Sequence, residues 1–307
     1  MPRLVVYDTS RQRTTAFTLA FARGANRHPN WTVEHLPISD YLKNGLHPGL
    51  VPGQDAVATL GILRGTGLMM KECASEGIDY YYMDHAYFTP GYSGKGWMRI
   101  VKNGHSCTSL RDVDSGRWKK HFKGKNKCLP WLKNHERGDK IVICPPTNAV
   151  SWFQDINYDW GETIKSKLES ILPLEEHSRI VIRHKPKEPI VDNRGNLLEL
   201  RTVPNLAGGS LEDDLNSACC VIAYNSMVAL TATLKGIPVI TGEHSCCTRI
   251  SYSIDDFKRG PYPDVFELEP ECRKSLLFWL ARNQWTRDEI LEGHAWRQLR
   301  KFYDNEN

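Results

Sequence analysis

The stretch that decides the fold is Lys140-Ile141-Val142-Ile143-Cys144, an apolar run of strand length that ends at a pair of prolines. A helical pattern at 162–171 follows it, and strand-like and helical runs then alternate along the chain. The further strand-like runs lie at 179–183, 219–224 and 237–240, and a helical pattern at 227–235 separates the last two. Such alternation with short connections predicts a parallel sheet wrapped by helices.

Upstream of residue 140 the same class of pattern is less regular. Strand-like runs are expected at 4–7, 31–38, 78–83 and 97–101, with a helix at 61–74. Residues 103–138 show no periodicity and are expected to form an excursion between two lobes. Because one core rarely grows beyond about 250–300 residues, the 307 residues predict two α/β lobes. We place them at 1–138, on the acceptor side, and at 139–307, with two terminal helices at 271–282 and 286–302.

Composition narrows the class of protein. Hydrophobic residues make up 40% and charged residues 25% of the chain, as in an ordinary globular protein. No apolar run reaches the length of a membrane span and no signal-peptide pattern opens the chain, so a cytoplasmic protein is expected. The nine cysteines include two vicinal pairs but no CxxC spacing, which favours buried apolar cysteines over disulfides or a zinc site. The glycine, histidine and serine motifs of dinucleotide-binding, ATP-binding, zinc-protease and serine-hydrolase proteins are absent from the sequence.

Positive charge is concentrated in one segment, RWKKHFKGKNK at 117–127. The net charge of +4 becomes −2 when the six Lys and Arg of this segment are removed. Such a segment can pair with nucleic-acid phosphates while its aromatic side chains stack on bases; a solvated lysine-rich loop is the alternative. The candidate nucleic-acid contacts are Arg117, Trp118, Lys119, Lys120, Phe122, Lys123, Lys125 and Lys127, together with Arg99 and Lys102.

Polar residues follow three strands of the second half. Ligands of open parallel sheets bind at the carboxyl ends of the strands, and a helix N-terminus there favours anions. The predicted diphosphate contacts are Arg183, His184, Lys185, Ser210, Asn225, Ser226, Met227 and Glu243. The competing interpretation makes Ser226 only a helix cap and Arg183 and Lys185 ordinary surface charges.

In the first half, Asp84 and His85 come directly after the tyrosine-rich strand. A carboxylate or imidazole at a strand end could take the proton from an acceptor hydroxyl, so both are the predicted catalytic residues. A salt-bridged aspartate and a structural histidine are the alternative.

Several short collinear stretches carry a family resemblance. They are LEDDL at 211–215, VIAYNS at 221–226, LKGIPV at 234–239, LARNQWT at 280–286, YMDHAYF at 82–88 and CPP at 144–146. Together they resemble GT-B glycosyltransferases, above all capsule-polysaccharide-type transferases and related proteins of bacterial viruses. The resemblance implies two Rossmann-like lobes with parallel sheets and C-terminal helices. It also implies a nucleoside-diphosphate sugar, with a UDP-sugar expected, held without metal by the second lobe through Arg183, Lys185, Asn225 and Ser226. Asp84 or His85 would be the base. The sequence departs from many relatives at Thr231, where they carry an acid that could bind the donor.

The acceptor is a separate question. The basic segment and the likeness to virus proteins favour DNA with 5-hydroxymethylated pyrimidines, in the host cytoplasm if a phage encodes the chain. A capsule or other saccharide acceptor, a non-catalytic nucleic-acid-binding protein and a sugar-nucleotide epimerase are the alternatives.

Overall fold

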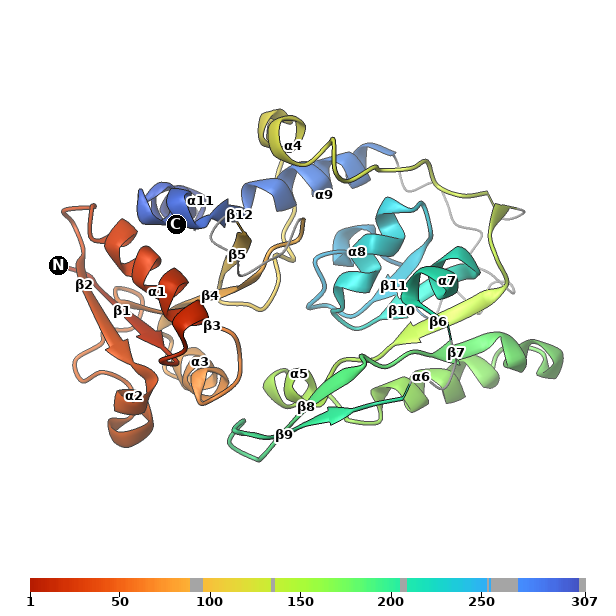
Figure 1. Ribbon diagram of the computed structural model, residues 1–307, viewed down its shortest axis with the longest axis horizontal. Coiled ribbons are helices and arrows are strands. Elements are labelled where there is room, and N and C mark those ends of the chain that lie inside the picture. Colours follow the sequence, from red (N-terminus) through yellow and green to blue (C-terminus); the bar gives the residue numbers. More distant parts are fainter. Residues whose placement is uncertain (89–95, 134–135, 205–208, 253, 255–269, 304–307) are drawn as a thin grey trace. The chain divides into compact units, whose positions relative to one another are not determined.

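The computed structural model describes residues 1–88, 96–133, 136–204, 209–252, 254 and 270–303, and the chain folds into two compact units (Figure 1). The first unit comprises Met1–His105, Val191–Leu197 and Ala281–Asn307, and the second comprises Ser106–Ile190 and Leu198–Leu280. Both have α/β architecture, so the predicted fold class is confirmed.

The first unit is built on a six-stranded sheet in the order β12-β5-β4-β3-β1-β2. Its strands are β1 (Arg3–Asp8), β2 (Thr32–Pro37), β3 (Ala56–Leu60), β4 (Asp79–His85), β5 (Trp97–Lys102) and β12 (Gln284–Thr286). Strands β2, β1, β3 and β4 are parallel, whereas β5 runs antiparallel to both of its neighbours. The prediction of a parallel sheet fails at β5. This strand begins at Trp97, soon after β4 ends at His85, and a crossover between parallel strands needs about a dozen residues or more.

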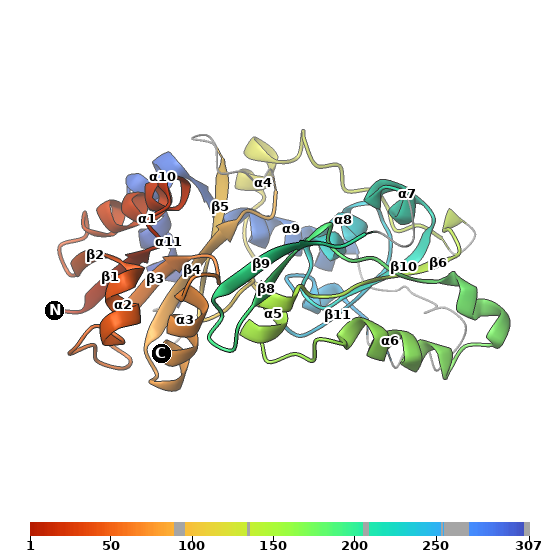
Figure 2. The same ribbon diagram turned by 60° about the horizontal axis from the view of Figure 1, so that its bottom comes forward.

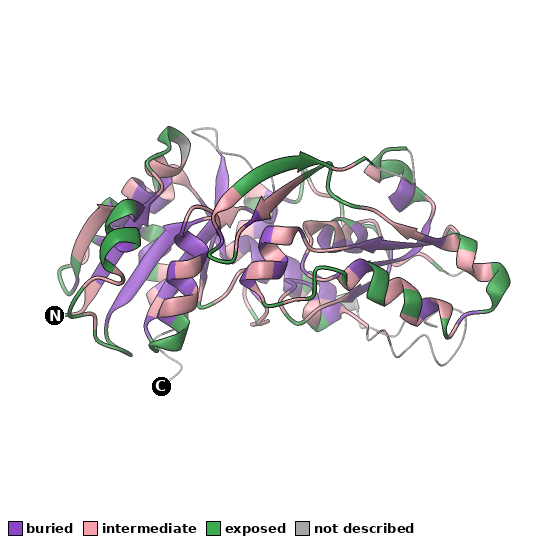
Figure 3. Ribbon diagram, turned by 90° about the horizontal axis from the view of Figure 1, so that it is seen from below, coloured by how far each residue is buried: buried purple, intermediate pink, exposed green. Residues whose placement is uncertain are grey.

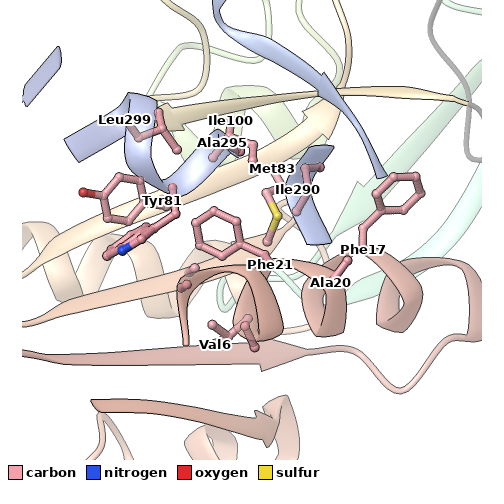
Figure 4. Packing of buried hydrophobic residues seen from close by; sticks show 14 of the residues in the cluster. Val6, Phe17, Ala20, Phe21, Tyr81, Met83, Ile100, Ile290, Ala295 and Leu299 are labelled. Atoms are coloured by element: carbon pink, nitrogen blue, oxygen red, sulfur yellow. The ribbon is translucent and has the colours of Figure 1, made fainter. Parts of the chain in front are cut away.

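Helices cover both faces of this sheet. They are α1 (Gln12–Ala25), α2 (Ile38–Asn44), α3 (Thr66–Ser75), α10 (Arg287–Leu291) and α11 (His294–Tyr303). Alternate residues of β1, β3, β4 and β5 pack against α1, α10 and α11, where Phe21 and Tyr81 lie within one apolar cluster (Figure 4). The Trp296 ring contacts those of Phe21 and Tyr81 edge-on, at centroid distances of 5.7 and 5.1 Å.

From Ala281 onward the chain belongs to the first unit, whereas the sequence placed all of 139–307 in the second lobe. The reason is the pairing of the short strand β12 with β5, in which Trp285 lies opposite Met98. Because α10 and α11 follow β12 directly, this pairing places them on the same face of the first sheet as α1.

The second unit contains a parallel four-stranded sheet in the order β11-β10-β6-β7 (Figure 2). Its strands are β6 (Lys140–Cys144), β7 (Ile180–Ile182), β10 (Ala218–Ala223) and β11 (Val239–Thr241), with a separate two-stranded pair β8 (Lys187–Val191) and β9 (Leu197–Thr202). The helices are α4 (Gly116–His121), α5 (Asn148–Phe153), α6 (Trp160–Glu169), α7 (Leu211–Asn216), α8 (Met227–Leu234) and α9 (Pro270–Arg282). Figure 3 shows the inner strands of both main sheets buried, whereas the edge strand β2 is intermediate or exposed.

The segment expected as an excursion between lobes belongs, from Ser106 onward, to the second unit. Its backbone is tied to the end of α8, since Leu129 N–H donates to Leu234 O and Leu132 N–H donates to Gly236 O. Within it, the Cys107 thiol accepts a hydrogen bond from Trp279 Nε1 of α9 (2.8 Å). The segment lacks sequence periodicity because it packs as irregular chain, not because it is unpacked.

All nine cysteines are free thiols, and seven of them are buried, as their apolar surroundings in the sequence predict. Among the residues that the structure describes, no helix has both the length and the apolar content needed to cross a membrane.

Candidate functional site

The carboxyl ends of the four parallel strands meet at one edge of the second unit's sheet. The register pairs Ala223 of β10 with both Cys144 of β6 and Thr241 of β11. On the other side, the Arg183 N–H continues the β7 ladder by donating to Ile143 O (2.8 Å). The residues that follow each strand therefore start from the same edge, which is where parallel sheets bind ligands.

Arg183 lies at this edge but its charge is already balanced. Its Nη1 is hydrogen-bonded to the carboxylate of Asp214 on α7, and its Nη2 donates to Gly209 O (3.3 Å). The Asp214 side chain is only 2% exposed, and Lys140 Nζ lies 3.4 Å from it. Lys140, at the amino end of β6, and Arg183, after the carboxyl end of β7, thus share one buried carboxylate in a structural network. His184 and Lys185, next along the chain, are exposed, and Lys185 is the exposed permanent charge that follows β7.

The turn from β10 into α8 contains three of the predicted contacts. Ser226 caps α8, since its hydroxyl accepts from the Val228 N–H (3.3 Å). Asn225 is buried and its Nδ2 donates to Gln154 Oε1 at the end of α5 (2.9 Å). Met227 is the first residue of the helix. The structural interpretation of Ser226 is thus correct, but the cap also fixes the helix N-terminus at the ligand edge, where its partial positive charge favours an anion.

Aromatic side chains gather beside this turn, and the sequence analysis did not single them out. The Tyr224 ring lies edge-on to Trp160 (5.8 Å between centroids) and 6.1 Å from the His244 imidazole. A Cβ on Gly242 would come within 2.5 Å of the Tyr224 ring, so the absence of a side chain there gives the ring its place. The position of Tyr224 directly after a buried strand was the signal that could have identified it. Glu243 is highly exposed, at 79% for the side chain, and lies 3.5 Å from His244 Nε2.

Ser210 has a structural task. Its hydroxyl accepts from the Asp213 N–H (3.1 Å) and its own N–H donates to the Asp213 carboxylate (2.7 Å), which together form a capping box at the N-terminus of α7.

The first unit carries a second constellation at the end of β4. Tyr82 Oη donates to Asp84 Oδ2 (2.6 Å), and Arg99 Nη2 of β5 donates to the same oxygen (3.0 Å). Burial by itself raises the pKa of Asp84, but the Arg99 and His105 charges and the hydrogen bonds from Tyr82 and the His85 N–H lower it to about 2. A carboxylate with so low a pKa is a weak base near neutral pH. Asp84 is therefore suited to holding charge in place, and this weighs against it as the proton acceptor.

The same pair holds the backbone of His85. Asp84 Oδ1 accepts from the His85 N–H (2.7 Å), and Arg99 Nη1 donates to the His85 carbonyl (3.0 Å). The His85 imidazole is half-buried, and its position is constrained because both the N–H and the carbonyl of its main chain are hydrogen-bonded.

A further carboxylate–imidazole pair was missed by the sequence analysis. Asp8, the last residue of β1, lies 3.1 Å from His35 Nε2 on β2, and its other oxygen accepts from the Ser10 N–H. Asp8 occupies the carboxyl edge of the first sheet, as Asp84 does. The signal was present, since Asp8 follows directly on the expected strand at 4–7.

Four of the predicted nucleic-acid contacts are corrected by their burial and partners. Trp118 and Phe122 are 6% and 0% exposed and pack in the core of the second unit, so they are not available for base stacking. Arg99 is 3% exposed and paired with Asp84. Lys102 Nζ lies 2.7 Å from Asp79 at the other end of β4. The amphipathic spacing within 117–127 explains the outcome, because the aromatic side chains fill the inner side of α4 and the following turn.

The remaining residues of that segment match the prediction of a charged surface. Five lysines are exposed, and Arg117 is half-buried; the lysines are Lys119, Lys120, Lys123, Lys125 and Lys127. Among the described residues, no group of three or more His, Cys, Asp or Glu side chains is arranged to hold a metal ion.

Comparisons with known proteins give the following. No protein-family model matches the chain, and no curated protein sequence matches it. Two solved structures from Thermosulfurimonas dismutans are similar to it. One, described as KpsC, beta Kdo 2,7 transferase, is 11% identical, with a TM-score of 0.41 and coverage of 96% of this chain and 99% of that chain. The other, described as KpsC, beta Kdo 2,4 transferase, is 13% identical, with a TM-score of 0.43 and coverage of 92% and 90%. A functional assignment must therefore come from the chain's own residues.

Proposed function

We propose that the chain is a glycosyltransferase that takes a sugar from a nucleoside diphosphate. The observation that carries the proposal is the common edge of β6, β7, β10 and β11. The capped N-terminus of α8 follows β10, and the exposed side chains of His184 and Lys185 follow β7, with β6 between these two strands. A diphosphate is the ligand that such an edge suits, because backbone N–H groups, the helix dipole and a lysine all favour negative charge.

In this proposal the second unit binds the leaving group. The first N–H groups of α8 and the Lys185 ammonium stabilise the charge that develops on the diphosphate. The aromatic group of Tyr224, Trp160 and His244 beside the same turn supplies a surface for the nucleotide base, with uridine the first base to test. Asn225, anchored to Gln154, holds the turn in shape. Arg183 supports the edge through Asp214 and does not contribute a full unbalanced charge.

In this proposal the first unit supplies the general base, the group that accepts the proton of the acceptor hydroxyl. The oxygen of the acceptor forms a bond to the anomeric carbon as the bond from that carbon to the diphosphate oxygen breaks, and the acceptor proton passes to His85. Asp84 and Arg99 act as positioning residues that fix the His85 main chain. This assignment prefers His85 to Asp84 because the pKa of Asp84, lowered to about 2 by Arg99 and its other partners against the effect of burial, makes it a poor proton acceptor.

For the acceptor we propose a 5-hydroxymethylated pyrimidine in DNA. Its support is the exposed lysine surface of the segment 117–127, which can neutralise backbone phosphates but offers no stacking rings. Binding would then be strongly salt-dependent and indifferent to sequence.

One experiment tests donor and acceptor together. The chain is incubated with a panel of sugar nucleotides and duplex DNA containing hydroxymethylcytosine, and the nucleosides are analysed by mass spectrometry. A sugar added to the modified base supports both parts. Release of a nucleoside diphosphate without modified DNA would move the acceptor to a saccharide, and turnover without any acceptor would favour an epimerase. DNA binding with no turnover of any donor would favour a non-catalytic protein.

The donor site has its own matched pair of variants. Lys185→Gln removes an exposed charge at the edge, and Lys187→Gln removes an exposed charge two residues further, in β8. We expect the first to weaken nucleoside diphosphate binding by about tenfold, the loss of one charge-assisted contact, and the second to leave it unchanged. Equal affinities in calorimetry would refute the placement of the diphosphate.

A further inference from the structure

The first unit contains a pocket at the end of its sheet opposite to Asp84 and Asp8. Its volume is about 370 Å³, and its lining comprises Pro2, His28, Asn30, Trp31, Trp296, Arg297 and Arg300. Pro2 directly precedes β1 and Trp31 directly precedes β2, and the Thr32 N–H donates to Pro2 O (2.9 Å). The pocket is therefore at the amino ends of these parallel strands, whereas Asp84 and His85 are at the carboxyl end of β4.

The permanently charged groups of the pocket are both arginines. Arg297 and Arg300 are three residues apart on α11 and thus share a helix face, and His28 and Asn30 contribute from the α1–β2 connection. Guanidinium groups donate hydrogen bonds and never accept them. Among the described residues that line the pocket, none is acidic. Such a lining suits an anion.

The two tryptophans hold one of the arginines in place. The guanidinium of Arg300 lies 4.6 Å from the centre of the Trp31 ring and 5.9 Å from that of Trp296. Both rings are buried, at 9% and 1% exposed, and meet edge-on at 5.0 Å. A planar guanidinium stacked on a fixed aromatic floor loses less conformational freedom when it binds an anion. His28 is also tethered, because its Nε2 lies 3.4 Å from Gly293 O.

We propose that this pocket is a binding site for a small phosphate monoester of about monosaccharide size. The phosphate would be held by Arg297 and Arg300, whose fork-shaped donors match two phosphate oxygens. His28 and Asn30 would contact the attached hydroxyl groups. The volume is within the range of small-molecule sites, about 300–1,000 Å³. The position at the amino edge makes it an accessory site, separate from the proposed transfer site, so it stands independently of that proposal.

The test measures binding of glucose 6-phosphate, inorganic phosphate and glucose to the full chain by calorimetry. We expect saturable binding of glucose 6-phosphate, weaker binding of phosphate and none of glucose. Arg297→Gln should weaken glucose 6-phosphate binding by about tenfold, the loss of one charged contact. The Arg297 side chain is exposed, so the variant should fold. Arg300→Gln should weaken binding similarly, with its folding checked by thermal melting because Arg300 packs on Trp31.

The matched control is Arg23→Gln, an exposed arginine in the last turn of α1 that does not line the pocket. It should bind glucose 6-phosphate like the wild type. Equal losses in Arg23→Gln and Arg297→Gln would show a general charge effect and overturn the site. Absence of saturable binding below about 10 mM, an affinity weaker than about −3 kcal/mol, would also overturn it. Phosphate binding as tight as glucose 6-phosphate would reject the sugar-sized ligand.

Discussion

Replacing Asp84 with asparagine should destabilise the first unit far more than the same change elsewhere on β4. The substitution keeps the shape of the side chain and removes the charge that faces Arg99. Arg99 is 3% exposed and cannot turn to water, so its guanidinium would remain buried and lose the charge of Asp84. Removing one partner of a buried pair typically costs about 3–5 kcal/mol.

The pH dependence of the free energy of unfolding gives a second measure of how much the Asp84 charge stabilises the fold. The pKa of Asp84 is about 2 in the fold against an ordinary value of 3.8, because Arg99 and the other partners outweigh the burial that raises it. At about 1.4 kcal/mol per pH unit, this difference corresponds to about 2 kcal/mol of stability. Since the folded pKa lies below the unfolded one, this stabilisation is complete above about pH 4 and is lost as the pH falls towards about 2.

The assay is urea unfolding at several pH values, followed by hydrogen exchange of the β4 and β5 backbone so that the first unit is observed by itself. Asp79→Asn is the matched control on the same strand. Asp79 lies 2.7 Å from the ammonium of Lys102, whose flexible stem can reach water once the partner is gone, and its loss should cost about 1 kcal/mol or less.

Equal destabilisation by Asp84→Asn and Asp79→Asn at neutral pH would contradict the claim that the buried Asp84–Arg99 pair contributes more stability than the Asp79–Lys102 pair. A difference between wild type and Asp84→Asn that stays constant from about pH 5 to about pH 2 would likewise contradict the linkage. In the double variant with Arg99→Met, part of the loss should be recovered, because the uncompensated charge is removed.

Three further predictions concern packing and helix capping, each measured by urea or thermal unfolding. Gly236→Ala should destabilise the second unit by about 2 kcal/mol or more, because φ is +79° and a Cβ would lie 1.9 Å from Pro130 O; a neutral outcome would contradict the close approach. Phe122→Ala should cost about 3–5 kcal/mol, while the neighbouring Lys123→Gln should change stability by about 0.5 kcal/mol at most and lower salt-sensitive DNA binding instead. A small loss of stability in Phe122→Ala with a large loss in Lys123→Gln would mean that the Phe122 ring faces solvent. Ser210→Ala should cost about 1 kcal/mol through loss of the α7 cap, and an unchanged midpoint would show that the cap is dispensable.

Local sequence patterns determined a large part of the second unit. The strands β6 and β10, the helix α8 and the glycine that ends it follow from apolar runs and turn residues, because burial on both faces of a parallel sheet produces continuous apolar strands. The capping box of Ser210 with Asp213 was also readable, since its two hydrogen bonds join residues three apart. The same patterns identified the strand ends, and with them Asn225, Ser226 and Lys185, as the edge where we propose that a ligand binds.

Tertiary structure alone decided which charges are balanced and which aromatic side chains face inward. Arg183 and Asp214 are 31 residues apart, and Arg99 and Asp84 are 15 apart, so their pairing depends on how helices and strands pack. A lysine-rich segment shows its charge in the sequence, whereas the burial of Trp118 and Phe122 depends on the core against which the short helix α4 and its following turn pack. The placement of α10 and α11 in the first unit rests on β12, a strand of three residues. So short a strand has no pattern of its own, and its partner β5 lies almost two hundred residues earlier in the chain.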